Sequence, residues 1–81
     1  MNKHYLFRKA SVIHAIKCNK SANLEVGIQS YNQFVDFKVK IEGADDNDIN
    51  VLNAINAELN IWAGQNPIAK DTEINNLING R

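Results

Sequence analysis

The chain has 81 residues, of which 44% are hydrophobic and 22% are charged, a composition typical of one small globular domain. Nine basic and nine acidic residues give a formal net charge of zero, so a general attraction to nucleic acid or to an anionic membrane is not expected. The length excludes enzymes built from a cofactor domain and a substrate domain, and the single cysteine excludes an internal disulfide. We therefore expect one domain over residues 1–81 that holds no cofactor.

The N-terminal segment carries no predicted targeting signal. Its apolar run is interrupted by Arg8 and Lys9, whereas a signal peptide needs about 7–15 uninterrupted apolar residues. No stretch of the sequence approaches the roughly 18 apolar residues of a membrane span. These features predict a cytoplasmic protein, in its own cell or in a host cell, that does not bind membranes.

Residues 5–18 fit both a helix and a strand. Leu6, Ala10, Ile13 and Ile16 follow helical spacing, whereas Val12, His14, Ile16 and Cys18 alternate. The β-branched and aromatic residues favour a strand, and a third strand would make the sheet wide enough to be covered by a helix. We therefore predict a strand here, with residues 19–23 as the loop that follows it.

Alternating apolar and polar residues predict a β-hairpin in the next part of the chain. Leu24, Val26 and Ile28 alternate with polar residues or glycine. From residue 35 to residue 42, odd positions are apolar and even positions are charged, which is the pattern of a half-buried strand. The short polar segment 30–33 would join the two strands as an antiparallel hairpin.

In the second half of the chain, the apolar spacing becomes that of helices. The acids within residues 45–48 are suited to cap a helix, and apolar residues then recur at steps of three and four up to Trp62. Gly64 ends this main helix, and a short helix is predicted from residue 71 or 72 up to Gly80.

Together these elements predict a small α+β domain in the order β-β-β-α-α. A three-stranded antiparallel sheet would be covered on one face by the main helix plus the short C-terminal helix. The predicted core packs three residues of the main helix against three of the hairpin: Leu52, Leu59 and Trp62 against Val26, Phe37 and Val39.

The patterns for catalysis and metal binding are weak. His4, His14 and Cys18 are the only usual nitrogen or sulfur ligands, and two ligands without a third rarely hold zinc. Residues 46–50 begin like an EF-hand calcium loop, but the glycine and the final glutamate that such a loop requires are missing from their positions. An enzyme could be built only around Cys18 and His14, so we predict no enzyme and no catalytic, cofactor or metal residues.

Charge is divided unevenly between the two halves of the chain. Residues 1–40 carry seven basic and two acidic groups, and residues 41–81 carry two basic and seven acidic groups, which gives +5 and −5. Either the two layers complement each other internally, or a charged surface attracts a partner of opposite sign. The second interpretation places Lys9, Lys38 and Lys40 on a partner-binding surface.

The main helix carries a second candidate surface. Asn53, Asn56 and Asn60 recur at steps of three and four, and their amides can both donate and accept hydrogen bonds. These asparagines are either codon bias on a solvated face or a surface that binds another protein. The apolar stripe beside them is wide, which predicts further contact with the terminal helix or with a second copy of the chain.

Thirteen asparagines, ten isoleucines and seven lysines, all with A/T-rich codons, indicate an AT-rich genome of the kind that many phages and mobile elements have. In size and layout, the predicted domain looks like the small inhibitor and adaptor proteins that such elements encode, of which anti-CRISPR proteins are one group. We predict a non-enzymatic protein-binding module, specifically an inhibitor that occupies a surface of a host or defence complex. The alternative is a small nucleic-acid-binding accessory protein that uses the basic N-terminal half.

Overall fold

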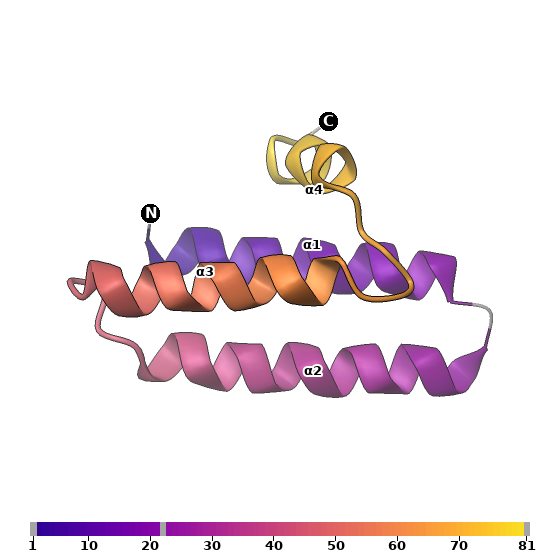
Figure 1. Ribbon diagram of the computed structural model, residues 1–81, viewed down its shortest axis with the longest axis horizontal. Coiled ribbons are helices and arrows are strands. Elements are labelled where there is room, and N and C mark those ends of the chain that lie inside the picture. The colour runs from indigo at the N-terminus through magenta and orange to yellow at the C-terminus, as the bar shows by residue number, and fades with distance from the viewer. Residues whose placement is uncertain (1, 22, 81) are drawn as a thin grey trace.

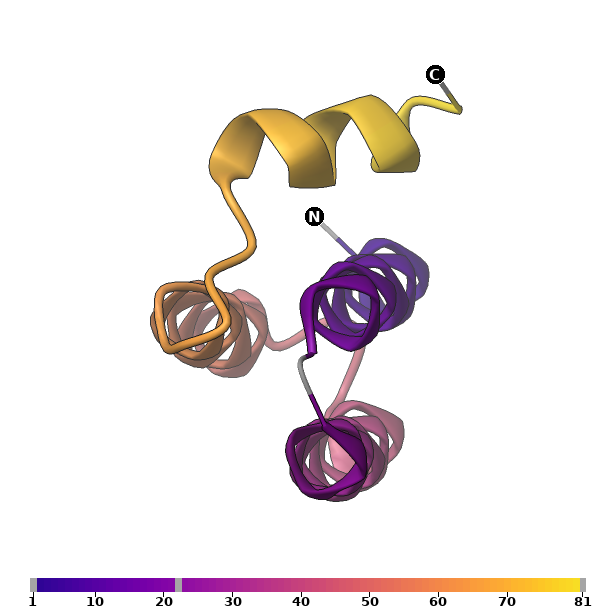
Figure 2. The same cartoon turned by 90° about the vertical axis from the view of Figure 1, so that its right-hand side faces the viewer.

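The structure is a computed structural model that describes residues 2–21 and 23–80. Within them the chain forms four α-helices and no strand: α1 (Lys3–Lys20), α2 (Leu24–Gly43), α3 (Ile49–Ala63) and α4 (Asp71–Ile78). Helices α1 and α3 run in one direction and α2 runs in the opposite direction, while α4 crosses them (Figure 1). Seen along the first three helices, α1, α2 and α3 form a triangle and α4 lies over α1 (Figure 2).

The predicted α+β class is wrong, because every segment predicted as a strand is helical. Residues 5–18 lie within α1, which settles the ambiguity of that segment in favour of the helix. Both strands of the predicted hairpin, together with the segment 30–33 predicted to join them, form the single helix α2. The two helices predicted in the second half are confirmed as α3 and α4.

The alternation within α2 has a helical explanation. Successive residues of an α-helix are rotated by about 100°, so residues two apart lie on nearly opposite sides. Phe37 and Ile41 pack towards the core, whereas Val35 and Val39 are exposed. A helix with apolar residues on two sides therefore produces the same sequence pattern as a half-buried strand.

Side-chain caps fix the starts of three helices. Asn2, Asn23 and Asp48 each accept a hydrogen bond from the backbone N–H three residues ahead, at 2.9, 3.0 and 3.3 Å. Such caps satisfy amide groups that have no partner inside the helix. The asparagine at the end of the predicted loop 19–23 is thus the start signal of α2, and the capping role predicted for the acids of residues 45–48 is confirmed at Asp48.

Helix α1 is the centre of the bundle, since it contacts all three other helices. The core combines side chains from every helix with Ala69 of the loop before α4: Leu6, Ala10, Ile13, Ile16, Ile41, Leu52, Ile55, Leu59, Trp62, Ala63, Ala69 and Ile74. Leu52, Leu59 and Trp62 are buried as predicted, and Phe37 stacks on Trp62 with ring centroids 5.2 Å apart. The predicted place of Val39 in the core is wrong, because this side chain is 64% exposed.

Candidate functional site

The outward side of α2 carries a row of exposed apolar side chains that runs for most of the helix. The row, here called the α2 stripe, consists of Leu24, Ile28, Tyr31, Val35 and Val39. Its members are between 37% and 80% exposed. Their steps of four, three, four and four residues place them within one sector of the helix, over a length of about 22 Å. These are the spacings by which one helix packs against another.

An aromatic group extends the α2 stripe towards α1. The ring of Tyr31 lies 5.8 Å from the ring of His14, and His14 stacks on Phe34 at 5.2 Å with the two planes 3° apart. The ammonium of Lys38 lies 5.6 Å from the centre of the Phe34 ring, a distance at which a cation is attracted to the ring face. The α1 side of the stripe is therefore aromatic and basic.

The opposite flank of the α2 stripe is acidic. Glu25 and Asp36 are exposed and share one side of α2, because they are eleven residues apart, and Asp36 lies there beside residues of α3. Within the described part of the chain, no cation lies within ion-pair distance of either carboxylate. The stripe thus separates an acidic flank from a basic one.

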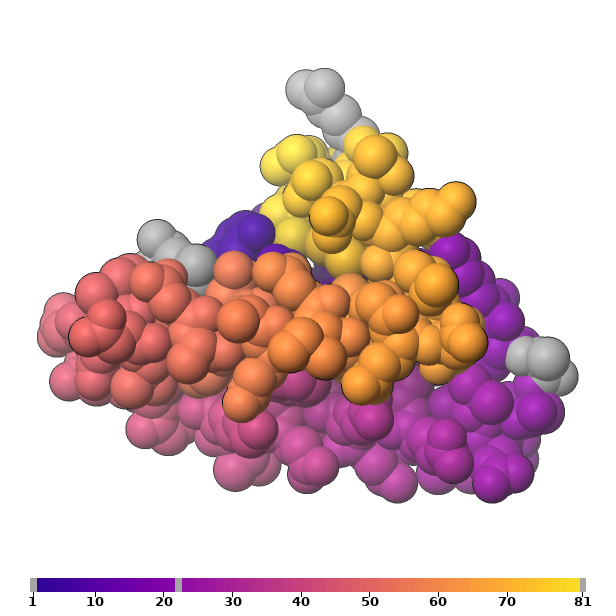
Figure 3. Space-filling view, in the orientation of Figure 1, coloured from indigo at the N-terminus to yellow at the C-terminus, as the bar shows by residue number. Residues whose placement is uncertain are grey.

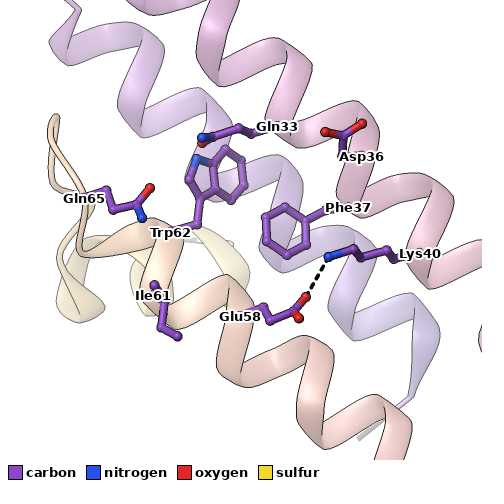
Figure 4. Close-up of a pocket in the computed structure, with 8 residues that line it drawn as sticks. All are labelled: Gln33, Asp36, Phe37, Lys40, Glu58, Ile61, Trp62 and Gln65. Atoms are coloured by element: carbon purple, nitrogen blue, oxygen red, sulfur yellow. Dashed lines mark hydrogen bonds and ion pairs between the residues drawn. The ribbon is translucent and has the colours of Figure 1, made fainter.

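A shallow hollow of about 250 Å³ between α2 and α3 adjoins the acidic flank (Figure 4). Phe37 and Trp62 line it between the two helices, and Asp36 stands at its α2 side. Lys40 reaches across to Glu58, with Nζ and Oε2 3.0 Å apart. Because this ion pair is neutral as a whole, Asp36 leaves the hollow with a net negative charge.

The structure also brings together the residues of the enzymatic alternative. Either ring nitrogen of His14 lies near Cys18 Sγ, at 3.5 and 3.7 Å, and His14 Nδ1 lies 2.8 Å from the hydroxyl of Ser30. Burial lowers the pKa of His14. Among residues 2–21 and 23–80, no group of three or more histidine, cysteine or acidic side chains is placed to hold a metal ion. Cys18 and His14 come from consecutive turns of one helix, so their proximity follows from their spacing and needs no functional explanation.

The three predicted lysines of the partner surface lie in different surroundings. Lys38 is exposed beside the α2 stripe, and Lys40 is exposed but paired with Glu58. Lys9 is 7% exposed and donates a hydrogen bond of 2.8 Å to Asn56 Oδ1. Burial lowers the pKa of Lys9, an effect that nearby Asp71 opposes. Only Lys38 therefore lies next to the stripe with its ammonium free of an acidic partner in the described chain.

The predicted asparagine row is divided in the same way. Asn53 and Asn60 are exposed on α3, whereas Asn56 is half-buried and holds Lys9. The structure does not bring these asparagines together with Lys38, which lies on α2. Figure 3 shows α3 along the front of the molecule, with α2 below it and α4 above.

Most basic residues of the first half of the chain form hydrogen bonds or ion pairs within the molecule. Lys17 is 2% exposed and donates to the carbonyl oxygens of Gln65 and Pro67, at 2.6 and 2.9 Å. Burial lowers its pKa. Five of the seven basic residues in the first half make a hydrogen bond or ion pair to the second half: Lys3, Lys9, Lys17, Lys20 and Lys40. Most basic residues of the first half are therefore held within the fold, but only Lys20 and Lys40 pair with acidic side chains of the second half.

The sequence interpretation did not single out the α2 stripe as a site. The signal was present: once residues 24–43 are taken as a helix, their apolar residues fall into two rows, and only one can face the core. The stripe was hidden because the same residues also fit a hairpin.

No family model, curated protein or solved structure matches the chain. None of the helices in the described ranges is both long enough and apolar enough to cross a membrane.

Proposed function

We propose that this protein is a non-enzymatic protein-binding module and that the α2 stripe is its contact surface. The observation that carries the proposal is five exposed large apolar side chains in one row along the longest helix. A contiguous apolar patch on a small domain marks an interaction site more often than scattered apolar residues do. Removing such a side chain from water contributes about 1.5–3 kcal/mol when burial is complete, so a partner that covers the row gains a substantial driving force.

Internal use of the basic residues supports a protein partner over a nucleic-acid partner. Affinity for nucleic acid depends on lysine and arginine side chains that neutralise phosphates. Lys17 and Lys9 are buried, and Lys40 is paired with Glu58, so these side chains are committed within the fold. Among residues 2–21 and 23–80, Arg8 and Lys38 are the exposed cations of α1 and α2 without an acidic partner, which is few for phosphate recognition.

The proposed mode of action is inhibition by occupying a surface of a host or defence complex. The small size and a single long apolar row suit a protein that acts by covering a partner's surface. The predicted likeness in layout to anti-CRISPR proteins depended on the three-stranded sheet, which the structure does not contain in its described residues. The proposal therefore rests on the α2 stripe and on size alone.

The test is to place charge in the middle of the stripe. The double variant Ile28→Glu with Val35→Glu should stay folded, because both side chains are exposed, and should lose its partner. Tagged wild-type protein and variant would be used to capture host proteins, with quantitative mass spectrometry of what each retains. Leu77→Glu, at a similarly exposed apolar position on α4, is the matched control and should retain the same partner.

Two results would contradict the proposal. If the stripe variant retains the same protein as the wild type, the stripe is not the contact surface. If the wild type instead binds generic DNA or RNA with a steep dependence on salt, the nucleic-acid alternative is correct.

A further inference from the structure

We infer that the α2 stripe binds an amphipathic helix of another protein, one whose flank carries basic residues opposite Glu25 and Asp36. This inference rests on the proposed function, because it names the chemistry of the partner for the same surface. It is carried by the register of the apolar row, the opposite charges of its two flanks and the like charges that a second copy would bring together.

The length and narrow width of the α2 stripe favour an elongated partner. It extends for about 22 Å but is only one helix wide, because its members lie in a single sector of α2. A helix laid along this row can place its own apolar residues between those of the stripe at the same steps of three and four.

The acidic flank of the α2 stripe determines which charge a complementary partner carries. Glu25 and Asp36 are eleven residues apart, which is three turns and about 16 Å along the axis. Asp36 also gives the hollow between α2 and α3 its negative charge. A partner helix with lysine or arginine at the same separation would meet both carboxylates, whereas an acidic flank would be repelled.

A second copy of the chain is the main competing occupant of the α2 stripe, because the apolar residues of two α2 helices can be aligned with each other. An antiparallel pair of α2 helices, related by a twofold axis between Tyr31 and Asn32, would align Leu24 with Val39 and Ile28 with Val35 of the other copy. The apolar contacts alone would therefore allow a symmetric dimer.

The charges oppose that dimer. A twofold axis perpendicular to an antiparallel helix pair keeps each flank on its own side, so the acidic flank of one α2 would lie along the acidic flank of the other. Glu25 would then lie about 3 Å along the axis from Asp36 of the other copy. Like charges at an interface disfavour association, and a partner with a basic flank removes this repulsion.

The experiment uses two synthetic helical peptides of about 18 residues, long enough to span the row. Both carry the same leucine seam at steps of three and four and glutamine on one flank. The other flank carries lysines in the first peptide and glutamates in the second, at positions eleven residues apart. Binding of each to the intact protein is measured by fluorescence anisotropy at about 0.05 M and about 0.5 M NaCl, where screening differs strongly.

We expect the lysine peptide to bind at least fivefold more tightly at low salt, with a smaller preference at high salt. The variant Glu25→Gln with Asp36→Asn should bring the two affinities within about twofold of each other, since its charged flank is gone. The matched control Asp45→Asn with Asp46→Asn loses the same charge from the loop after α2 and should keep the preference. The stripe variant Ile28→Glu with Val35→Glu should bind neither peptide.

Three results would overturn the inference. These are equal binding of both peptides by the wild type, binding of neither, and a stable dimer in light scattering that the stripe variant dissociates. If the stripe variant loses its cellular partner while the wild type shows no preference between the peptides, the proposed function stands and this inference fails. If the stripe variant keeps its cellular partner, the proposed function itself fails.

Discussion

Helices α1 and α2 are similar in length, with 18 and 20 residues, but they hold opposite places in the fold. Six residues of α1 are buried, including Lys9 and Lys17, because α2, α3 and α4 all pack against this helix. In α2 only Ser30 and Ile41 are buried, although the helix is rich in apolar residues. Between these two helices, burial thus follows the number of packed neighbours more closely than apolar content.

This contrast indicates that a functional surface in so small a domain lies on the helix whose apolar side chains the fold leaves uncovered. Helix α1 accepts two lysines into its buried side, since each ammonium finds a hydrogen-bond acceptor within the fold. Helix α2 leaves the apolar side chains of the α2 stripe exposed to water, and no other described part of the chain covers them.

The largest effect is expected from removing apolar volume in the two helices. Ile13 of α1 is fully buried and Ile28 of α2 is 51% exposed. Ile13→Ala should lower the free energy of unfolding by about 2–5 kcal/mol, because it leaves a cavity in the core. Ile28→Ala should change it by less than about 0.5 kcal/mol. Urea unfolding followed by circular dichroism measures both, and equal losses would show that α2 is packed as tightly as α1.

A smaller difference is expected when lysines of the two helices lose their charge. Lys17→Met leaves the carbonyl oxygens of Gln65 and Pro67 without their donor, at a cost of about 1–3 kcal/mol. Lys38→Met, at an exposed position of α2, should stay within about 0.5 kcal/mol of the wild type. The same unfolding measurement applies. A Lys17→Met protein as stable as the wild type would mean that its hydrogen bonds only offset the cost of burying the ammonium.

The smallest effect concerns pH and the contact between α1 and α2. Burial lowers the pKa of His14 below its ordinary value of 6.5, so the unfolded chain takes up the proton first as the pH falls. The stability that His14 contributes is complete above pH 6.5 and decreases as the pH falls towards its lower folded pKa. The carboxyl of Glu73, whose pKa a hydrogen bond from Lys20 lowers, responds only below its ordinary value of 4.5.

Thermal unfolding from about pH 7 to about pH 5 isolates this titration. His14→Gln keeps a polar partner for Ser30 but does not titrate, so its melting temperature should vary less than that of the wild type. His4→Gln, at an exposed position of α1, is the control and should follow the wild type. Identical pH profiles for the wild type and His14→Gln would show that the histidine is equally hydrated in the folded and unfolded chains.

The sequence alone specifies the helices of the second half of the chain. The cap at Asp48, the steps of three and four up to Trp62 and the stop at Gly64 define α3, because all of these signals act within the helix itself. It also determined that Leu59 and Trp62 are buried, since a helix with one apolar side turns that side to the core. The expectation that Lys38 and Lys40 are exposed also agrees with the structure.

The fold of the first half, and with it the candidate site, depends on tertiary packing. The alternation of Val35, Phe37, Val39 and Ile41 suits a strand with one buried face and a helix with two apolar sides equally well. Local pattern cannot separate these, because the difference lies in which neighbours cover the segment. Lys9 likewise became internal only because α3 supplies Asn56 as its acceptor. Packing of α1 against three helices left one apolar side of α2 uncovered, and that surface is the α2 stripe.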